Sequence, residues 1–184
     1  MAWDMWMLDR PAKADVDRER WPFVPFERVG PLSFGMTPDE VAGALGIGAD
    51  FRLSGPVSER RLLLYDAGIN VYFDEKFGLA CVAVDAFDGP QVVSPDGFAL
   101  VGREPSLVRP WVLAQVEALN TNYVVNECMD VAIEEIGLVL RVQRAGDGSL
   151  TRPLFVARPW SEDDSAYMHT PEGRIPEFEF RHMA

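Results

Sequence analysis

The sharpest structural signal in the sequence is the segment Phe34-Gly-Met-Thr-Pro-Asp-Glu-Val41. Threonine is a favourable helix N-cap, proline suits the first helical position, and a glutamate three residues after the threonine completes a capping box. Apolar residues at Met36, Val41 and Leu45 form a short stripe of helical spacing, and Gly46 ends it. The segment therefore predicts a short, well-capped helix.

Three strand-like runs follow this helix, separated by short turn segments that contain aspartate and glycine. The runs are Arg61–Tyr65, Ile69–Phe73 and Leu79–Ala86. In the middle run Ile69, Val71 and Phe73 share one side, and Asn70, Tyr72 and Asp74 share the other. Alternation with a period of two is typical of a sheet that packs one face on a core.

The same succession recurs further along the chain. Phe34-Gly-Met-Thr-Pro38 is echoed by Val101-Gly-Arg-Glu-Pro105, 67 residues later, and Gly68-Ile-Asn-Val71 is echoed by Gly137-Leu-Val-Leu140, 69 residues later. An apolar helical stripe over Leu107–Leu119 follows the second copy of the motif. The strand-like runs of this second copy are Glu127–Glu134, Leu138–Gln143 and Pro153–Ala157.

The repeat predicts an α+β fold. One unit of this size buries too little surface to be stable alone, so we expect two tandem units, each a helix followed by an antiparallel sheet. They would share one sheet and place their helices on one face of it. The implied single domain spans residues 27–159, with repeats at about 27–90 and 91–159.

The two ends of the chain differ from this middle part. Residues 1–26 mix tryptophan and phenylalanine with charges and three prolines, which predicts an irregular arm packed on the body. Residues 160–184 are acidic and interrupted by prolines, which predicts a tail that wraps the surface.

The charge balance narrows the choice of partners. Lys+Arg 17 against Asp+Glu 29 gives a net charge of −12. Such a surface repels nucleic-acid phosphates and anionic membranes, so we expect neither as a partner, whereas a basic protein is favoured. The sequence has no apolar run of about 18–20 residues and no signal-peptide pattern, so we expect a cytoplasmic location.

Few residues point to a metal or a cofactor, and we expect neither. His169 and His182, the two histidines, lack metal-ligand spacing, and Cys81 and Cys128 each lie in an apolar run typical of a buried free thiol. A phosphate-binding loop and a nucleophile elbow are both missing. The sequence therefore indicates no catalytic residue of these classes.

An acidic group around the run Glu127–Glu134 allows two interpretations. Asp130 and Glu134 share a strand face in this prediction, and Glu135 follows them. Paired carboxylates in a sheet-lined cleft are typical of a hydrolase or lyase that uses acid–base chemistry. The same carboxylates on a solvated sheet face would attract a basic protein and raise its association rate.

The segment Phe34–Val41, with Leu45-Gly46 after it, resembles the helix-opening motif of beta-lactamase-inhibitor-protein-like domains. Outer-membrane assembly lipoproteins of the SmpA/OmlA type carry a similar motif. The resemblance covers residues 29–86 directly and residues 98–158 through the repeat spacing. It implies tandem helix-and-sheet repeats whose open sheet face engages a protein. The lipoproteins carry an acylated cysteine, which is not found in this sequence. The inhibitors are stapled by disulfides, whereas Cys81 and Cys128 form at most one bridge.

These observations predict a non-enzymatic inhibitor, most concretely a bacterial immunity protein that neutralises a basic toxin or enzyme domain by occluding its active site. Small acidic cytoplasmic proteins of this kind are similar to toxin–antitoxin immunity proteins in fold and charge. The predicted contact residues are Asn70, Tyr72, Asp130, Glu134, Arg141, Trp160, Glu162, Asp163 and Asp164. The alternatives are the hydrolase or lyase described above and a homo-oligomer building block without a site.

Overall fold

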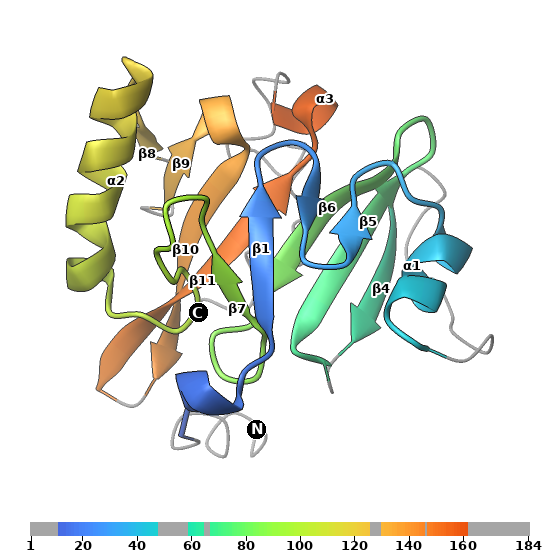
Figure 1. The fold of residues 1–184 in the computed structure, drawn as a ribbon, viewed down its shortest axis with the longest axis horizontal. Coiled ribbons are helices and arrows are strands. Elements are labelled where there is room, and N and C mark those ends of the chain that lie inside the picture. The colour runs from blue at the N-terminus through green and yellow to red at the C-terminus, as the bar shows by residue number, and fades with distance from the viewer. Residues whose placement is uncertain (1–10, 48–58, 65–66, 126–129, 146, 162–184) are drawn as a thin grey trace, which may run out of the picture.

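Two β-sheets and two main helices build the part of the chain that this computed structural model describes, which is residues 11–47, 59–64, 67–125, 130–145 and 147–161 (Figure 1). The fold is α+β, as the sequence predicts. No helix in these ranges is long and apolar enough to cross a membrane. The predictions for His169, His182 and Cys128 lie outside the described residues.

The larger sheet has seven antiparallel strands in the order β4-β5-β6-β11-β10-β9-β8. Its strands are β4 (Glu59–Leu64), β5 (Ile69–Asp74), β6 (Gly78–Val84), β8 (Val124–Val125), β9 (Val131–Ile133), β10 (Leu138–Ala145) and β11 (Gly148–Val156). Helix α1 (Pro38–Ala44) precedes the first three strands, and helix α2 (Pro105–Leu119) precedes the other four. The prediction of two tandem helix-and-sheet units that share one sheet is therefore confirmed.

The two units meet where β6 pairs with β11. In this ladder Ala83 lies opposite Leu154, and Val82 lies opposite Phe155. Ala83 also lies opposite Asn70 in the β5–β6 ladder, and Leu154 lies opposite Val139 in the β10–β11 ladder, so Ala83 and Leu154 hold equivalent places in the two units. The units are thus related by a local two-fold axis that passes through the sheet between these two strands.

Backbone hydrogen bonds repeat this symmetry where each helix begins. In the first unit Gly35 N donates to Leu79 O at 2.9 Å, and Leu79 N donates to Met36 O at 2.8 Å. The second unit has the same pair of bonds, from Gly102 N to Thr151 O and from Thr151 N to Arg103 O, both at 2.8 Å. The glycine motifs seen in the sequence therefore tie each helix start to the last strand of its own unit, which is β6 in the first unit and β11 in the second.

The helix starts follow the sequence signals. The predicted capping box of α1 is present, because Glu40 N donates to Thr37 Oγ1 at 3.3 Å and Thr37 N donates to Glu40 Oε2 at 2.7 Å. Helix α2 begins at Pro105 and continues through Pro110, where proline leaves one backbone hydrogen bond unmade. The helix thus starts one turn before Pro110, at the proline that follows Glu104.

A second, four-stranded sheet covers part of the large one. Its order is β3-β2-β1-β7, with β1 (Arg20–Val24), β2 (Arg28–Val29), β3 (Leu32–Ser33) and β7 (Gln91–Val93). The prediction of an irregular arm is wrong for β1. Trp21 and Phe23 alternate with the exposed Arg20 and Pro22, and burial of these two aromatic rings favours a strand despite the nearby prolines.

The main core fills the space between the two sheets. Val41 of α1, Val108 and Trp111 of α2, and Trp21 and Phe23 of the small sheet all pack into it. Both main helices therefore lie on one face of the large sheet, as predicted (Figure 1). The opposite face carries a second cluster, which includes Trp160 of the short helix α3 (Arg158–Ser161). Cys81 of this cluster is buried, as predicted.

Gly68 and Gly137 occupy equivalent places in the two units, and substitution of Gly137 tests whether that place requires a glycine. Both have φ of +63° and stand directly before β5 and β10. A Cβ at residue 137 would lie 2.5 Å from Val156 O, so Gly137→Ala should lower the free energy of unfolding by about 1–3 kcal/mol. Gly43→Ala in α1 is the control, because a Cβ meets nothing within 4 Å there, and it should be neutral or stabilising by up to about 1 kcal/mol. Urea unfolding measures the free energy of unfolding of both variants. Equal effects of the two substitutions would contradict the role assigned to Gly137.

Candidate binding surface

Four of the nine contact residues predicted from sequence are buried on the second face of the large sheet. Tyr72 is 0% exposed, Arg141 and Trp160 are 1% exposed, and Asp130 is 2% exposed. Tyr72 does point away from the main core, but it packs in the second cluster with Trp160. The expectation that this sheet face is open to a partner is therefore wrong at these four positions.

Asp130 and Arg141 form an ion pair inside this face. Asp130 Oδ2 lies 3.5 Å from Arg141 Nε, and both side chains are almost completely shielded from solvent. Removing two charges from water is costly, so such a pair persists only when the partners stay together. The structure thus gives Asp130 and Arg141 a role in holding the sheet and leaves neither on the surface.

The carboxylates expected to form a cleft are not brought together. Asp130 directly precedes β9, whereas Glu134 lies in the 3-10 turn Glu134–Ile136, so the two do not share a strand face as predicted. Glu134 O accepts a hydrogen bond from Ser161 Oγ at 2.6 Å, and Glu135 is exposed and accepts one from Thr121 Oγ1. No group of three metal-ligating residues occurs in the described ranges.

Of the other predicted contact residues, Asn70 lies within the described part of the chain and three do not. Asn70 is partly exposed on β5, and Trp160 Nε1 donates to Asp74 Oδ2 at 3.1 Å on the neighbouring part of the sheet. Glu162, Asp163 and Asp164 lie outside the described residues, and their role stays a prediction.

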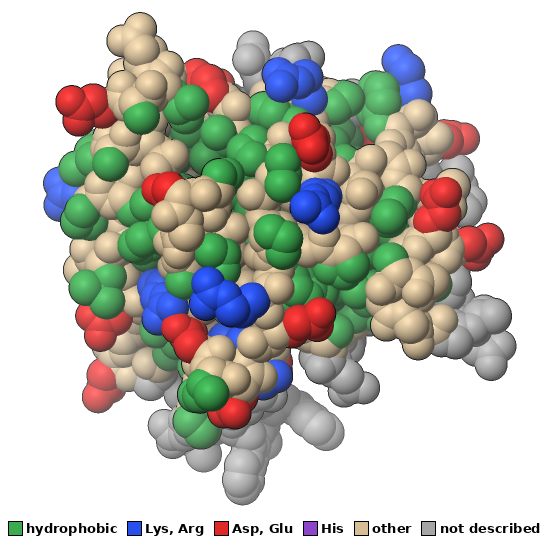
Figure 2. Space-filling view, in the orientation of Figure 1, with side chains coloured by type: hydrophobic (Ala, Val, Ile, Leu, Met, Phe, Trp, Pro, Cys, Tyr) green, Lys and Arg blue, Asp and Glu red, His purple; other side chains and the backbone are tan. Residues whose placement is uncertain are grey.

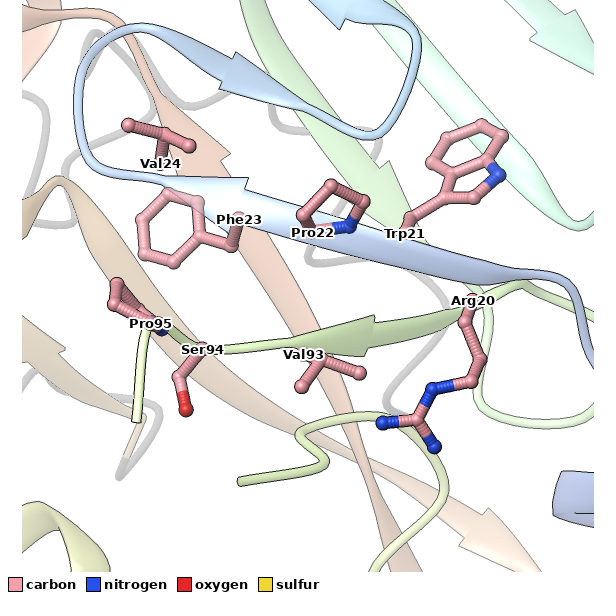
Figure 3. A pocket seen from close by; sticks show the side chains of 8 residues that line it. All are labelled: Arg20, Trp21, Pro22, Phe23, Val24, Val93, Ser94 and Pro95. Carbon is pink, nitrogen blue, oxygen red and sulfur yellow. The ribbon is translucent and has the colours of Figure 1, made fainter. Parts of the chain in front are cut away.

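An open depression of about 420 Å³ lies on the small sheet (Figure 3). The parallel pairing of β1 with β7, in which Trp21 lies opposite Val92 and Pro22 opposite Val93, brings its two walls together. The lining residues are Arg20, Trp21, Pro22, Phe23, Val24, Val93, Ser94 and Pro95. Pro22 and Pro95 are exposed, and Arg20 is the one ionisable side chain in this set.

The wall at Ser94 and Pro95 is held against α2. Asp96 accepts hydrogen bonds from Ser94 Oγ and, at Oδ2, from Trp111 Nε1 and Gln115 Nε2, both at 3.0 Å. The Phe98 ring stacks on Trp111 with centroids 5.3 Å apart and planes 13° apart. The hydrogen bond from Ser94, more than those from Trp111 and the Phe98 backbone, lowers the pKa of Asp96 below its ordinary value of 3.8.

A buried arginine holds the segment that directly precedes β1. Arg18 is 5% exposed, and its guanidinium donates to the carbonyl oxygens of Gly89 at 2.6 Å, Ala86 at 2.7 Å and Phe87 at 3.0 Å. These bonds attach the N-terminal segment to the loop before β7. Beneath the depression Phe23 packs on Phe155 of β11, with ring centroids 4.6 Å apart. The depression is therefore formed before any partner binds, which lowers the cost of binding.

This surface was not among the features predicted from the sequence. The available signal was the alternation of Trp21 and Phe23 with Arg20, Pro22 and Val24, which predicts a strand with one face turned outward. The opposing wall, from Val93 to Pro95, comes from a segment about 70 positions further along the chain, and no local pattern predicts a parallel pairing over that distance.

The lining of the depression suits the recognition of an apolar side chain. Concave apolar surfaces with one charged group at the end accept an apolar side chain and a neighbouring acceptor group. Comparison with known proteins adds no assignment: no family model, curated protein or solved structure matches the chain.

The pKa of Asp96 predicts how this wall responds to acid. Because folding lowers that pKa, the ionised carboxylate contributes stability that is complete above pH 3.8 and is lost as the pH falls through the folded-state pKa. The stability advantage of the wild-type chain over Asp96→Asn should therefore shrink in urea titrations as the pH falls from 7 to about 3. Ser94→Ala removes the largest cause of the lowered pKa. In a Ser94→Ala background, the stability advantage of Asp96 over its asparagine variant should therefore change less with pH. An advantage that is constant over this pH range would contradict the assigned contacts.

Proposed function

We propose that the chain is a non-enzymatic protein-binding inhibitor, most concretely a bacterial immunity protein that neutralises a toxin by covering its active site. The observation that supports this most is the open apolar depression over β1 and β7, which has fixed walls and Arg20 as its one ionisable lining group. Such a surface suits an anchoring side chain of another protein.

The charge supports a basic partner. The chain carries −12 overall, and Asp17, Glu19 and Glu27 are exposed within three residues of β1. Acidic groups around an apolar centre would accelerate association with a basic protein and pair with its cations. A toxin domain that binds phosphate-bearing substrates, such as a nuclease, has an active site of that charge.

The duplicated architecture supports a binding role through the resemblance to beta-lactamase-inhibitor-protein-like domains, which are tandem helix-and-sheet repeats. In this chain the second face of the large sheet is buried at Tyr72 and Arg141, so the proposed contact lies on the small sheet instead. The proposed mechanism is steric. An apolar side chain of the partner fills the depression, Arg20 contacts an acceptor beside it, and the body of the chain blocks substrate.

The proposal predicts a specific loss of binding when the depression is filled. Pro95 is exposed, so Pro95→Arg places a long charged side chain on the apolar lining while leaving the core intact. Capture from the native bacterium with the wild-type chain, followed by titration of the purified partner, should show stoichiometric loss of the partner's enzymatic activity. Pro95→Arg should weaken this affinity by at least about tenfold, which corresponds to about 1.4 kcal/mol.

Val16→Arg is the matched control, because Val16 is 89% exposed and lies outside the depression, so it should inhibit like the wild-type chain. Arg20→Glu separately tests the charged end of the lining. A captured partner that keeps full activity in the complex would contradict inhibition. Equal affinity of the wild-type and Pro95→Arg chains would contradict the proposed contact surface.

A further inference from the structure

Two arginines lie side by side within the second face of the large sheet. Arg141 is directly opposite Arg152 in the β10–β11 ladder, and each is two positions from Val139 or Leu154 of the second cluster. Because side chains alternate along a strand, both guanidinium groups lie on that face. Arg141 is 1% exposed and Arg152 is 6% exposed. Like charges directly opposite each other repel, and buried charges need counter-charges, so this pair calls for carboxylates.

The described elements do not account for the burial of this face. Within the described ranges, Trp160 of α3 is the one member of the second cluster that comes from outside the large sheet. Helix α3 has four residues and is about 6 Å long. The buried side chains run from Tyr72 on β5 across β6, β11 and β10 to Ala132 on β9, which is about 19 Å. They are buried in the single chain, so another segment of the same chain shields them.

The C-terminal segment, residues 162–184, starts from this face. It follows Ser161, whose Oγ donates to Glu134 O at 2.6 Å beside the start of β10. Arg141 lies three positions along β10 from Leu138, which is about 10 Å, and three extended residues after Ser161 span the same distance. Those three residues are all acidic: Glu162, Asp163 and Asp164.

Charge favours this segment over the two other long parts of the chain outside the described ranges. Residues 162–164 carry a charge of −3. Residues 1–10 have two aspartates and one arginine, which leaves −1, and residues 48–58 have one aspartate and one arginine, which leaves zero. Residues 48–58 also follow α1, which packs on the main-core face. The C-terminal segment therefore combines the required charge with the required starting point.

We propose that Arg141 and Arg152 form an internal carboxylate-binding site that holds the C-terminal segment across the second face of the large sheet. Asp130, whose Oδ2 lies 3.5 Å from Arg141 Nε, supplies a carboxylate from the β9 side. Two guanidinium groups and Asp130 sum to one positive charge, which carboxylates of residues 162–164 neutralise. Hydrogen bonds between guanidinium and carboxylate groups are among the strongest in proteins. The sheet face that the sequence predicts for a partner is then occupied by the chain itself, and the depression on the small sheet stays open.

Native-state digestion of the full-length chain with chymotrypsin tests the proposal. Tyr167 lies three positions beyond Asp164, and mass spectrometry measures the rate of cleavage after it. In the wild-type chain this rate should be at least about a hundredfold lower than in a free peptide of residues 160–174, because cleavage waits for release of the segment. The triple variant Glu162→Gln, Asp163→Asn, Asp164→Asn should be cleaved at least about tenfold faster than the wild-type chain, since it loses charge-assisted hydrogen bonds.

Exposed carboxylates on the other side of the molecule supply the matched control. Figure 2 shows that side, which bears the small sheet and α2, with its acidic side chains scattered. The control variant Glu19→Gln, Glu104→Gln, Glu117→Gln removes the same charge from exposed positions before β1 and at α2, and it should be cleaved after Tyr167 within about twofold of the wild-type rate.

Arg152→Gln tests the arginine side of the site. If the carboxylates act through the arginine pair, adding the triple substitution at residues 162–164 to Arg152→Gln should speed cleavage by less than about threefold further. A full tenfold addition overturns the assigned site. A wild-type segment that is cleaved as fast as the free peptide overturns the proposal without any variant, and so do equal rates in the triple variant and its control.

Discussion

The antiparallel pairing of β6 with β11 is the contact on which the rest of the structure depends. It joins two units that are each too small to bury a sufficient core, and its paired residues, from Cys81 opposite Val156 to Ala83 opposite Leu154, are all buried. Because the pairing follows a local two-fold axis, both units present helices to the same side of one continuous sheet. That sheet is wide enough to be covered by α1, α2 and the four-stranded sheet together.

The proposed binding surface on the small sheet follows from this arrangement. The small sheet takes β1 from before the first unit and β7 from before the second, and the joined large sheet supports both. Phe23, beneath the depression, packs on Phe155 of the strand β11 that forms the seam. The position of α2 has the same origin. It covers the second unit's half of the sheet, so its inner side is buried while its outer side is left as the margin of the molecule.

The sequence predicted what depends on neighbouring residues and missed what depends on distant ones. The capping box at Thr37 and Glu40 and the glycines at 68 and 137 are local signals, and the structure contains each of them. Alternation correctly turned Tyr72 away from the main core, but alternation says nothing of what covers the second face, so the burial of Tyr72 and Arg141 could not be foreseen. The depression was missed because its walls meet through a parallel pairing between distant strands.

Native-state hydrogen exchange across the β6–β11 pairing tests the central claim most directly. If the two units share one sheet and one core, amides in β5 and β6 should exchange with the same free energy as amides in β10 and β11, and that value should equal the free energy of global unfolding. Urea should then unfold the chain in a single transition. Protection of one unit at a free energy well below the other, with two separate transitions, would contradict the account.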